Sequence, residues 1–266
     1  MKLEVLTSGI WQTNSAVISH GGACLVTDPA YFPRELAAIA ERAQALGGAS
    51  AVAFTHGHWD HVMGHTACPG APVWMHEGLL QEIEGDTARA ARYLADAREF
   101  DSRWYVPRPH GHRWPAQRRG VADGQVLDLG GAQLLALHLP GHSPDGLGLW
   151  LDPVGVLLCG DYLSPCEIPF IDDPARYAGT LRRLLALIEH QRGEVVPGHG
   201  PRLTAAEAAA IARADLAYVE ALQAAAARSD RAALLDTPWP RAREVVGMRE
   251  AHLENCDKLL APGAPA

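Results

Sequence analysis

The chain has 266 residues, 48% of them hydrophobic, and a formal net charge of -8. The hydrophobic content is sufficient for a sizeable core, so we expect a globular protein of one large or two small domains. The negative charge and the lack of a basic run argue against nucleic acid as a partner. Residues 1–26 contain no charged segment followed by an apolar core, no apolar run is long enough to span a membrane, and the five cysteines lack framework spacing. We therefore expect a cytoplasmic protein with reduced thiols and no membrane partner.

The first part of the chain predicts an antiparallel start followed by a helix and another strand. Short apolar runs bounded by turn residues predict the strands, and a proline before an amphipathic stretch predicts the helix. The strands are expected at residues 3–7, 14–19, 23–27 and 51–54, and the helix at 33–46. Asp28 closes the third strand before Pro29, either as a turn residue or as a carboxylate that supports a metal-bound histidine.

Three histidines and one aspartate follow the strand at 51–54 within six positions: His56, His58, Asp60 and His61. Neutral imidazole and carboxylate are the ligands of zinc and other divalent metals. His56 and His58, two residues apart, can share one metal, while Asp60 and His61 face a second position. The alternative, a loop of solvated histidines, is disfavoured by this density of ligand types. Four ligands do not fill two metal sites, so we expect further donors at later strand ends.

After a strand at 72–75 and a helical segment from His76, the pattern loosens between residues 82 and 123. This stretch is rich in aromatic residues and arginines, including Trp104, Tyr105 and Arg108. Because long irregular segments in compact domains are often functional, we interpret it as a lid or substrate-binding insertion, with these three residues as candidate substrate contacts. The alternative is a surface elaboration with no role.

Three more candidate ligands stand at predicted strand exits: His142, Asp161 and His199. Two hairpins, at 125–139 and 146–159, precede His142 and Asp161, whereas a helix at 176–191 and a short strand precede His199. Glycine or proline flanks each residue and lets the backbone turn the side chain inward. Any one of these turns could be structural, but together they supply the missing donors.

The C-terminal part predicts helices. Residues 204–207 form a capping box that opens an alanine-rich helix to about residue 227. A proline-containing break at 237–240 precedes a last helix at 244–260, and residues 261–266 read as a frayed tail. The final helices either pack on the core or form the face of a homodimer.

With these residues in place, the chain resembles the metallo-β-lactamase-fold hydrolases, whose pattern is His-x-His-x-Asp-His followed by a His, an Asp and a His at later strand ends. The resemblance is to the glyoxalase II and lactonase branches. It implies an α/β fold, a four-layer αββα sandwich with C-terminal helices. Residues 1–201 would form the core, with 82–123 as a substrate-binding insertion, and residues 202–266 a helical extension packed on it.

Carried over to this sequence, the resemblance implies a dinuclear metal centre. His56, His58 and His142 would hold one ion, Asp60, His61 and His199 the other, and Asp161 would bridge both. Di-iron redox members usually carry glutamate in place of the second motif histidine, so His58 indicates two zinc ions, with iron or manganese as alternatives. A hydroxide bridging the ions would be the nucleophile, oriented by Asp60 as a catalytic residue. Tyr162 either contacts the substrate or packs in the core.

The presence of Asp161 and the apparent lack of a signal peptide disfavour antibiotic hydrolysis. The resemblance instead implies hydrolysis of a small-molecule ester, thioester or lactone, and the aromatic and arginine content of 82–119 suits a bulky acyl group. No anchored cations in the C-terminal helices support glutathione as a substrate component. The alternatives are a metal-dependent phosphodiesterase and a non-catalytic, ligand-binding member of the fold.

Overall fold

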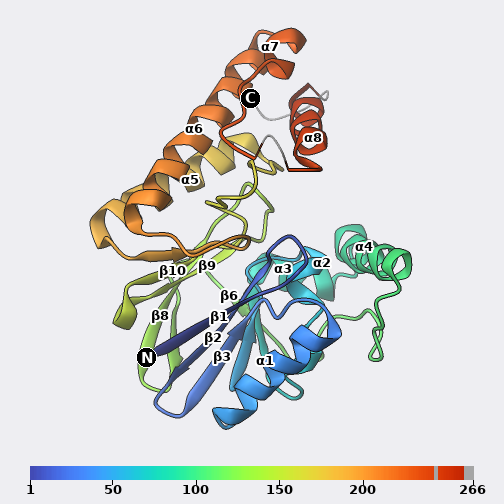
Figure 1. The fold of residues 1–266 in the computed structure, drawn as a ribbon, viewed down its shortest axis with the longest axis vertical. Coiled ribbons are helices and arrows are strands. Elements are labelled where there is room, and N and C mark those ends of the chain that lie inside the picture. Colours follow the sequence, from blue (N-terminus) through green and yellow to red (C-terminus); the bar gives the residue numbers. More distant parts are fainter. Residues whose placement is uncertain (243–244, 261–266) are drawn as a thin grey trace. The chain divides into compact units, whose positions relative to one another are not determined.

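The computed structural model describes residues 1–242 and 245–260, which fall into two compact units (Figure 1). The first unit joins residues 1–138 to 147–154. The second joins residues 139–146 to the chain from residue 155 onward. None of the helices in the described part of the chain is long and apolar enough to cross a membrane.

A mixed six-stranded sheet forms the centre of the first unit, with its strands in sequence order. The first two neighbour pairs are antiparallel hairpins and the remaining three are parallel. The apolar strands β3 and β4 are buried on both faces, as parallel strands covered by helices require. The strands are β1 (Lys2–Thr7), β2 (Asn14–His20), β3 (Ala23–Thr27), β4 (Ala51–Ala53), β5 (Val73–His76) and β6 (Arg118–Val121).

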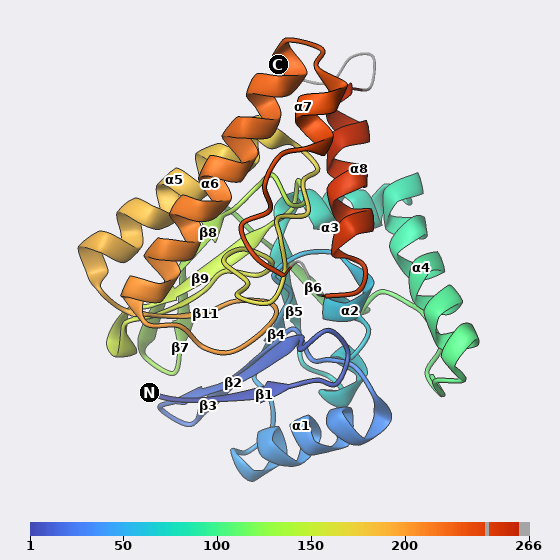
Figure 2. The same ribbon diagram turned by 45° about the horizontal axis from the view of Figure 1, so that its top comes forward.

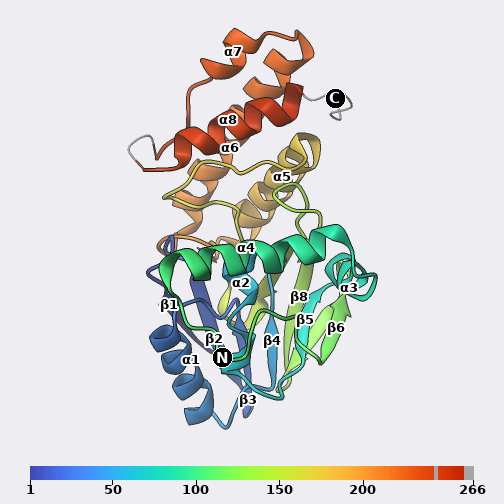
Figure 3. The same cartoon turned by 90° about the vertical axis from the view of Figure 1, so that its right-hand side faces the viewer.

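Helices α1 (Pro33–Ala45), α2 (Trp59–Val62), α3 (Glu77–Glu84) and α4 (Ala88–Trp104) belong to the same unit. Ile39 of α1, Leu79 of α3 and Tyr93 of α4 join one buried cluster with side chains of the sheet. Helix α4 contacts α2 and lies across it in Figure 3. These helices therefore close the core over the ends of the strands that carry the first group of candidate ligands.

The expectation of a loosened pattern throughout 82–123 is wrong, because α4 and β6 occupy much of that segment. Thr87 caps α4 by accepting a hydrogen bond from the Ala90 amide. The helix buries a narrow stripe that includes Ala90, Tyr93 and Ala97. Its many charged residues dilute this stripe, which is why the apolar periodicity did not predict the helix.

Strands β7 (Val126–Leu129), β8 (Ala132–His138) and β9 (Leu147–Leu151) complete the first unit as an antiparallel meander. They belong to a second sheet with the order β11-β10-β9-β8-β7. β7 packs against β3 of the first sheet. The two hairpins predicted at 125–139 and 146–159 correspond to these strands and β10.

The second unit carries the parallel pair β10 (Val156–Leu158) and β11 (Glu194–Val196) together with four helices. Helices α5 (Pro174–Gln191) and α6 (Ala205–Ala227) pack side by side (Figure 2). The predicted capping box is confirmed, since Thr204 and Glu207 bond to each other's backbone amides. The sequence did not predict α7 (Arg231–Leu235).

Helix α8 (Met248–Leu260) packs against α6 and α7. Its predicted start at residue 244 and the predicted tail at 261–266 lie outside the described residues. Two mixed sheets with flanking and C-terminal helices confirm the predicted α/β sandwich.

Candidate metal centre

The first group of candidate ligands lies where β3 and β4 end. The two strands are parallel neighbours, so their carboxyl ends meet, and the Asp28 amide donates to the Ala53 carbonyl at 2.9 Å. The Asp28 carboxylate accepts hydrogen bonds from the Thr55 amide at 2.7 Å and the Thr55 hydroxyl at 2.6 Å. Its Oδ2 also lies 3.1 Å from His61 Nδ1. This contact orients the imidazole so that Nε2 lies on the side of Asp60.

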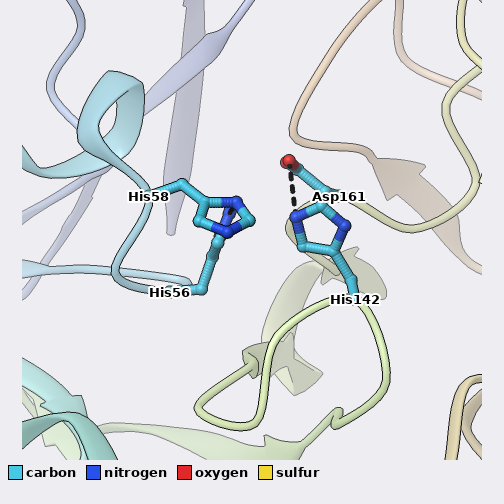
Figure 4. Close-up of side chains that lie close together, drawn as sticks. All are labelled: His56, His58, His142 and Asp161. Atoms are coloured by element: carbon cyan, nitrogen blue, oxygen red, sulfur yellow. Dashed lines mark hydrogen bonds and ion pairs between the residues drawn. The ribbon is translucent and has the colours of Figure 1, made fainter. Parts of the chain in front are cut away.

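His56 and His58 project from the turn after β4 toward one point. His56 Nε2 lies 2.9 Å from His58 Nδ1 (Figure 4). Gly57 between them is required by close packing, because a Cβ there would lie 2.6 Å from the Tyr93 ring and 2.9 Å from Leu79. Side chains of α3 and α4 thus pack against the turn and restrict the directions of both imidazoles.

Asp60 and His61 lie in the short helix α2, directly after His58. Both are buried, and Asp60 Oδ2 is 3.2 Å from His61 Nε2. The Thr13 hydroxyl, in the connection between β1 and β2, lies 3.4 Å from Asp60 Oδ2, and its shorter contact, at 2.8 Å, is with the Ile10 carbonyl. Ligand atoms that share a tetrahedral ion at about 2.1 Å lie about 3.4 Å apart. The Asp60 and His61 atoms therefore have the separation that one bound ion requires.

The second group lies in the second unit, where β10 and β11 end. Asp161 Oδ2 is 3.2 Å from His142 Nε2 (Figure 4), and Asp161 Oδ1 is 3.3 Å from His199 Nε2. His142 Nδ1 contacts the Phe170 carbonyl at 3.0 Å, which orients Nε2 toward Asp161. Gly198 is required here, because a Cβ would lie 2.2 Å from the Asp161 carboxylate.

The residues present fit a divalent metal. Each unit contributes histidines and aspartates of the kind that hold such ions, namely His56, His58, Asp60 and His61 in the first unit and His142, Asp161 and His199 in the second. Within each unit, neighbouring ligand atoms lie at separations close to those in a tetrahedral zinc site. Imidazole and carboxylate also suit iron and manganese.

Tyr162 supports the turn that carries His142. Its hydroxyl donates to the Pro140 carbonyl at 2.7 Å and accepts from the His142 amide at 3.0 Å. The side chain is buried, and this burial raises the pKa of the phenol. The hydroxyl therefore fixes backbone groups of the turn, and its predicted contact with substrate stays a prediction.

The other three predicted substrate contacts lie in two different environments. Trp104 and Tyr105 are exposed and line a cavity of about 890 Å³, together with Trp11, Phe32 and Phe100. The Arg108 guanidinium is instead buried and bonded to the Asp101 carboxylate through Nε at 2.9 Å and Nη2 at 3.1 Å. Arg108 thus has a structural partner, and its substrate role stays a prediction.

The sequence interpretation missed Thr13, Thr55, Trp11 and Trp59. Thr55 contacts Asp28 and Thr13 contacts Asp60, so both hold metal-site carboxylates. Trp11 and Trp59 are ring neighbours at 5.2 Å between centroids. For the two tryptophans a sequence signal was available. Trp59 lies inside the ligand motif, and Trp11 lies in the turn between the first two strands.

Comparisons with known proteins identify the family of the chain. Residues 8–199 match the family model of the metallo-beta-lactamase superfamily. A hydroxyacylglutathione hydrolase of Acidiphilium cryptum is 30% identical over 64% of this chain and 58% of its own length. The atrochrysone carboxyl ACP thioesterase AgnL7 of Paecilomyces divaricatus is 30% identical over 65% of this chain and 46% of its own length. The chain spans about half the length of the curated relatives it matches.

Solved structures share the fold. The di-iron-bound form of TTHA1623 has a TM-score of 0.57 and 27% identity, covering 77% of this chain and 96% of that one. TTHA1429 of Thermus thermophilus has a TM-score of 0.65 and 22% identity, covering 96% of this chain and 90% of that one. Since the family model matches more than half of the chain, the chain belongs to the metallo-beta-lactamase superfamily, with hydroxyacylglutathione hydrolases among its relatives.

Proposed function

We propose that the chain is a dinuclear, zinc-dependent hydrolase of a small-molecule ester, thioester or lactone. The observation that carries the proposal is the orientation of Asp161, whose two carboxylate oxygens face two different histidines, His142 and His199. A carboxylate placed between two ions presents its oxygens in this way. Relatives named as a hydroxyacylglutathione hydrolase, a carboxyl ACP thioesterase and an acyl-coenzyme A thioesterase support the same chemistry.

The proposal assigns His56, His58 and His142 to one ion and Asp60, His61 and His199 to the other, with Asp161 shared. The first unit offers four of these ligands and the second offers three, so neither set completes two coordination spheres alone. When bound, such a pair of ions supplies a water of lowered pKa and polarises the substrate carbonyl.

The chain's own residues hold this arrangement in place. Asp28 fixes the orientation of His61, and the Thr13 hydroxyl lies 3.4 Å from Asp60 Oδ2. We assign to Asp60 the further role of orienting the attacking water. The negative net charge supports a small molecule over nucleic acid as the substrate. All five cysteines lie within the described residues as free thiols, which supports a reducing compartment such as the cytoplasm.

The test combines metal quantification with a substrate panel of p-nitrophenyl esters, acyl thioesters, lactones and bis-p-nitrophenyl phosphate. We expect two metal equivalents per chain and hydrolysis of the carbonyl substrates that a chelator abolishes. His58→Ala should lose activity by about 100-fold or more, since removing a metal ligand leaves its ion incompletely held. His190→Ala, an exposed histidine on α5, is the control.

Two results would overturn the proposal. Fewer than one metal equivalent after reconstitution would indicate a member of the fold that binds ligands without turnover. A preference for the phosphodiester over every carbonyl substrate would identify a phosphodiesterase.

A further inference from the structure

The cavity beside α4 lies entirely within the first unit, and five aromatic side chains contribute to its lining. Its volume is about 890 Å³, and Trp11, Phe32, Phe100, Trp104 and Tyr105 line it. Trp11 and Trp104 are 53% and 60% exposed, which is unusual for residues whose burial would be favourable. Pockets of roughly 300–1,000 Å³ bury a whole drug-sized molecule. The cavity therefore has both the size and the surface of a site for a bulky apolar group.

The backbone holds Trp11 in position at some conformational cost. Trp11 and Gln12 both have positive φ values, 46° and 56°, which non-glycine residues rarely adopt. Thr13 stabilises the turn, because its amide and its hydroxyl both donate to the Ile10 carbonyl, at 2.9 and 2.8 Å. Strained residues that the surroundings hold in place are common at binding sites.

The cavity adjoins the metal-ligand motif. Trp59 lies between His58 and Asp60 in the sequence, and its ring is 5.2 Å from Trp11 and 4.7 Å from Phe100 between centroids. The hydroxyl of Thr13, two residues after Trp11, lies 3.4 Å from Asp60 Oδ2. A group held against Trp11 and Phe100 thus lies next to the turn that presents the first group of ligands.

The charges around the cavity indicate what part of a substrate it can hold. Asp96 and Glu99 of α4 line it against the single guanidinium of Arg103, which lies over the Trp104 ring at 5.6 Å. Asp96 also pairs with Arg92 at 3.6 Å, so two guanidinium groups balance these two carboxylates and leave no net positive charge to attract the phosphates of a nucleotide-containing carrier. Uncharged aromatic or aliphatic groups are accepted by the rings.

We propose that this cavity binds the uncharged, bulky acyl group of the substrate, of the size of a naphthoyl group or larger, and so selects among esters and thioesters. The inference rests on the proposed hydrolase function. Trp11 and Trp104 are the residues that set the preference.

The first test measures binding without turnover. The full chain, treated with a chelator, is titrated with N-phenyl-1-naphthylamine, an uncharged probe whose fluorescence rises in apolar sites. We expect one binding site, weakened at least tenfold by Trp11→Ala and by Trp104→Ala. Leu46→Ala, which removes a 37% exposed side chain at the end of α1, should bind as the unmodified chain does. Equal binding by all four proteins would overturn the proposal.

The second test measures selectivity in the metal-loaded protein. We expect kcat/KM for p-nitrophenyl 2-naphthoate to exceed that for p-nitrophenyl acetate at least tenfold. Both tryptophan variants should lose this preference through a higher KM for the naphthoate, whereas Leu46→Ala should keep it. Loss of both activities in parallel, or hydrolysis without an acyl preference, would overturn the inference and leave the hydrolase function standing. Probe binding that depends on both tryptophans, without hydrolysis of any ester, would overturn the hydrolase function and keep the cavity as a site for uncharged aromatic groups.

Discussion

At the residue scale, Asp28 controls the orientation of a predicted metal ligand. Its carboxylate accepts two hydrogen bonds from Thr55 and contacts His61 Nδ1. Asp28→Asn should weaken metal binding about 10- to 100-fold, because the amide has one acceptor oxygen and turns an NH2 group toward a donor. Competition against a chromophoric chelator measures the affinity. Asp86→Asn is a matched control, since both aspartates have positive φ, 42° and 47°. Equal metal affinity in the two variants would show that Asp28 only shapes the turn.

The same residues show how far the sequence predicts the site. His56, His58, Asp60 and His61 were recognisable because four potential ligands, three imidazoles and one carboxylate, fall within six positions. The contact between Asp28 and Thr55 was not predictable, since these residues are 27 positions apart. They meet only because β3 and β4 pair in parallel. The sequence accordingly allows Asp28 to be a turn residue or a support for a histidine, and the structure shows that its partners are Thr55 and His61.

At the scale of elements, Asp101 ties the segment after α4 back to the core. It accepts hydrogen bonds from Arg108 and from the Tyr31 hydroxyl, and it pairs with His112. Burial alone would raise the pKa of Asp101, but the hydrogen bonds from Arg108 and Tyr31 hold it below its usual value. Arg108→Ala should therefore lower the free energy of unfolding by about 3 kcal/mol, because it leaves a buried carboxylate without its main partner. Urea unfolding followed by circular dichroism measures the change.

Arg92→Ala is the control. Arg92 lies on α4, the helix that carries Asp101, and its side chain is 78% exposed and pairs with Asp96 at 3.6 Å. We expect it to cost less than about 0.5 kcal/mol. If Arg108→Ala keeps its stability and instead raises KM, Arg108 contacts the substrate, as the sequence predicts.

Elements were predictable where one signal dominated. Continuous apolar runs such as residues 23–27 and 51–54 located buried strands to within a residue or two. The capping box located the start of α6. Helix α4 was missed because its buried stripe consists largely of small residues among charged ones, and α7 because five residues are too few to show a period.

At the scale of the whole molecule, the proposed ligands come from segments between residues 56 and 199, and from both compact units. A ligand that binds only the folded chain stabilises it, by about 4 kcal/mol at a concentration 1,000 times its Kd. For a chain of this size, that raises the midpoint of thermal unfolding by roughly 8–16 °C. Zinc should therefore raise the midpoint of the chelator-treated protein by about this amount, as measured by differential scanning calorimetry.

The decisive variant for this prediction is His199→Ala, which removes one ligand of the second unit and leaves the four ligands of the first intact. If ions are held jointly by both units, the variant should lose at least half of the zinc-induced shift, because the affinity of one ion falls while the fold keeps its other contacts. His190→Ala removes an exposed histidine of the same unit and should keep the full shift. A full shift in His199→Ala would mean that residues 56–61 hold the metal by themselves, and the proposed pairing of the two sets of ligands would be wrong.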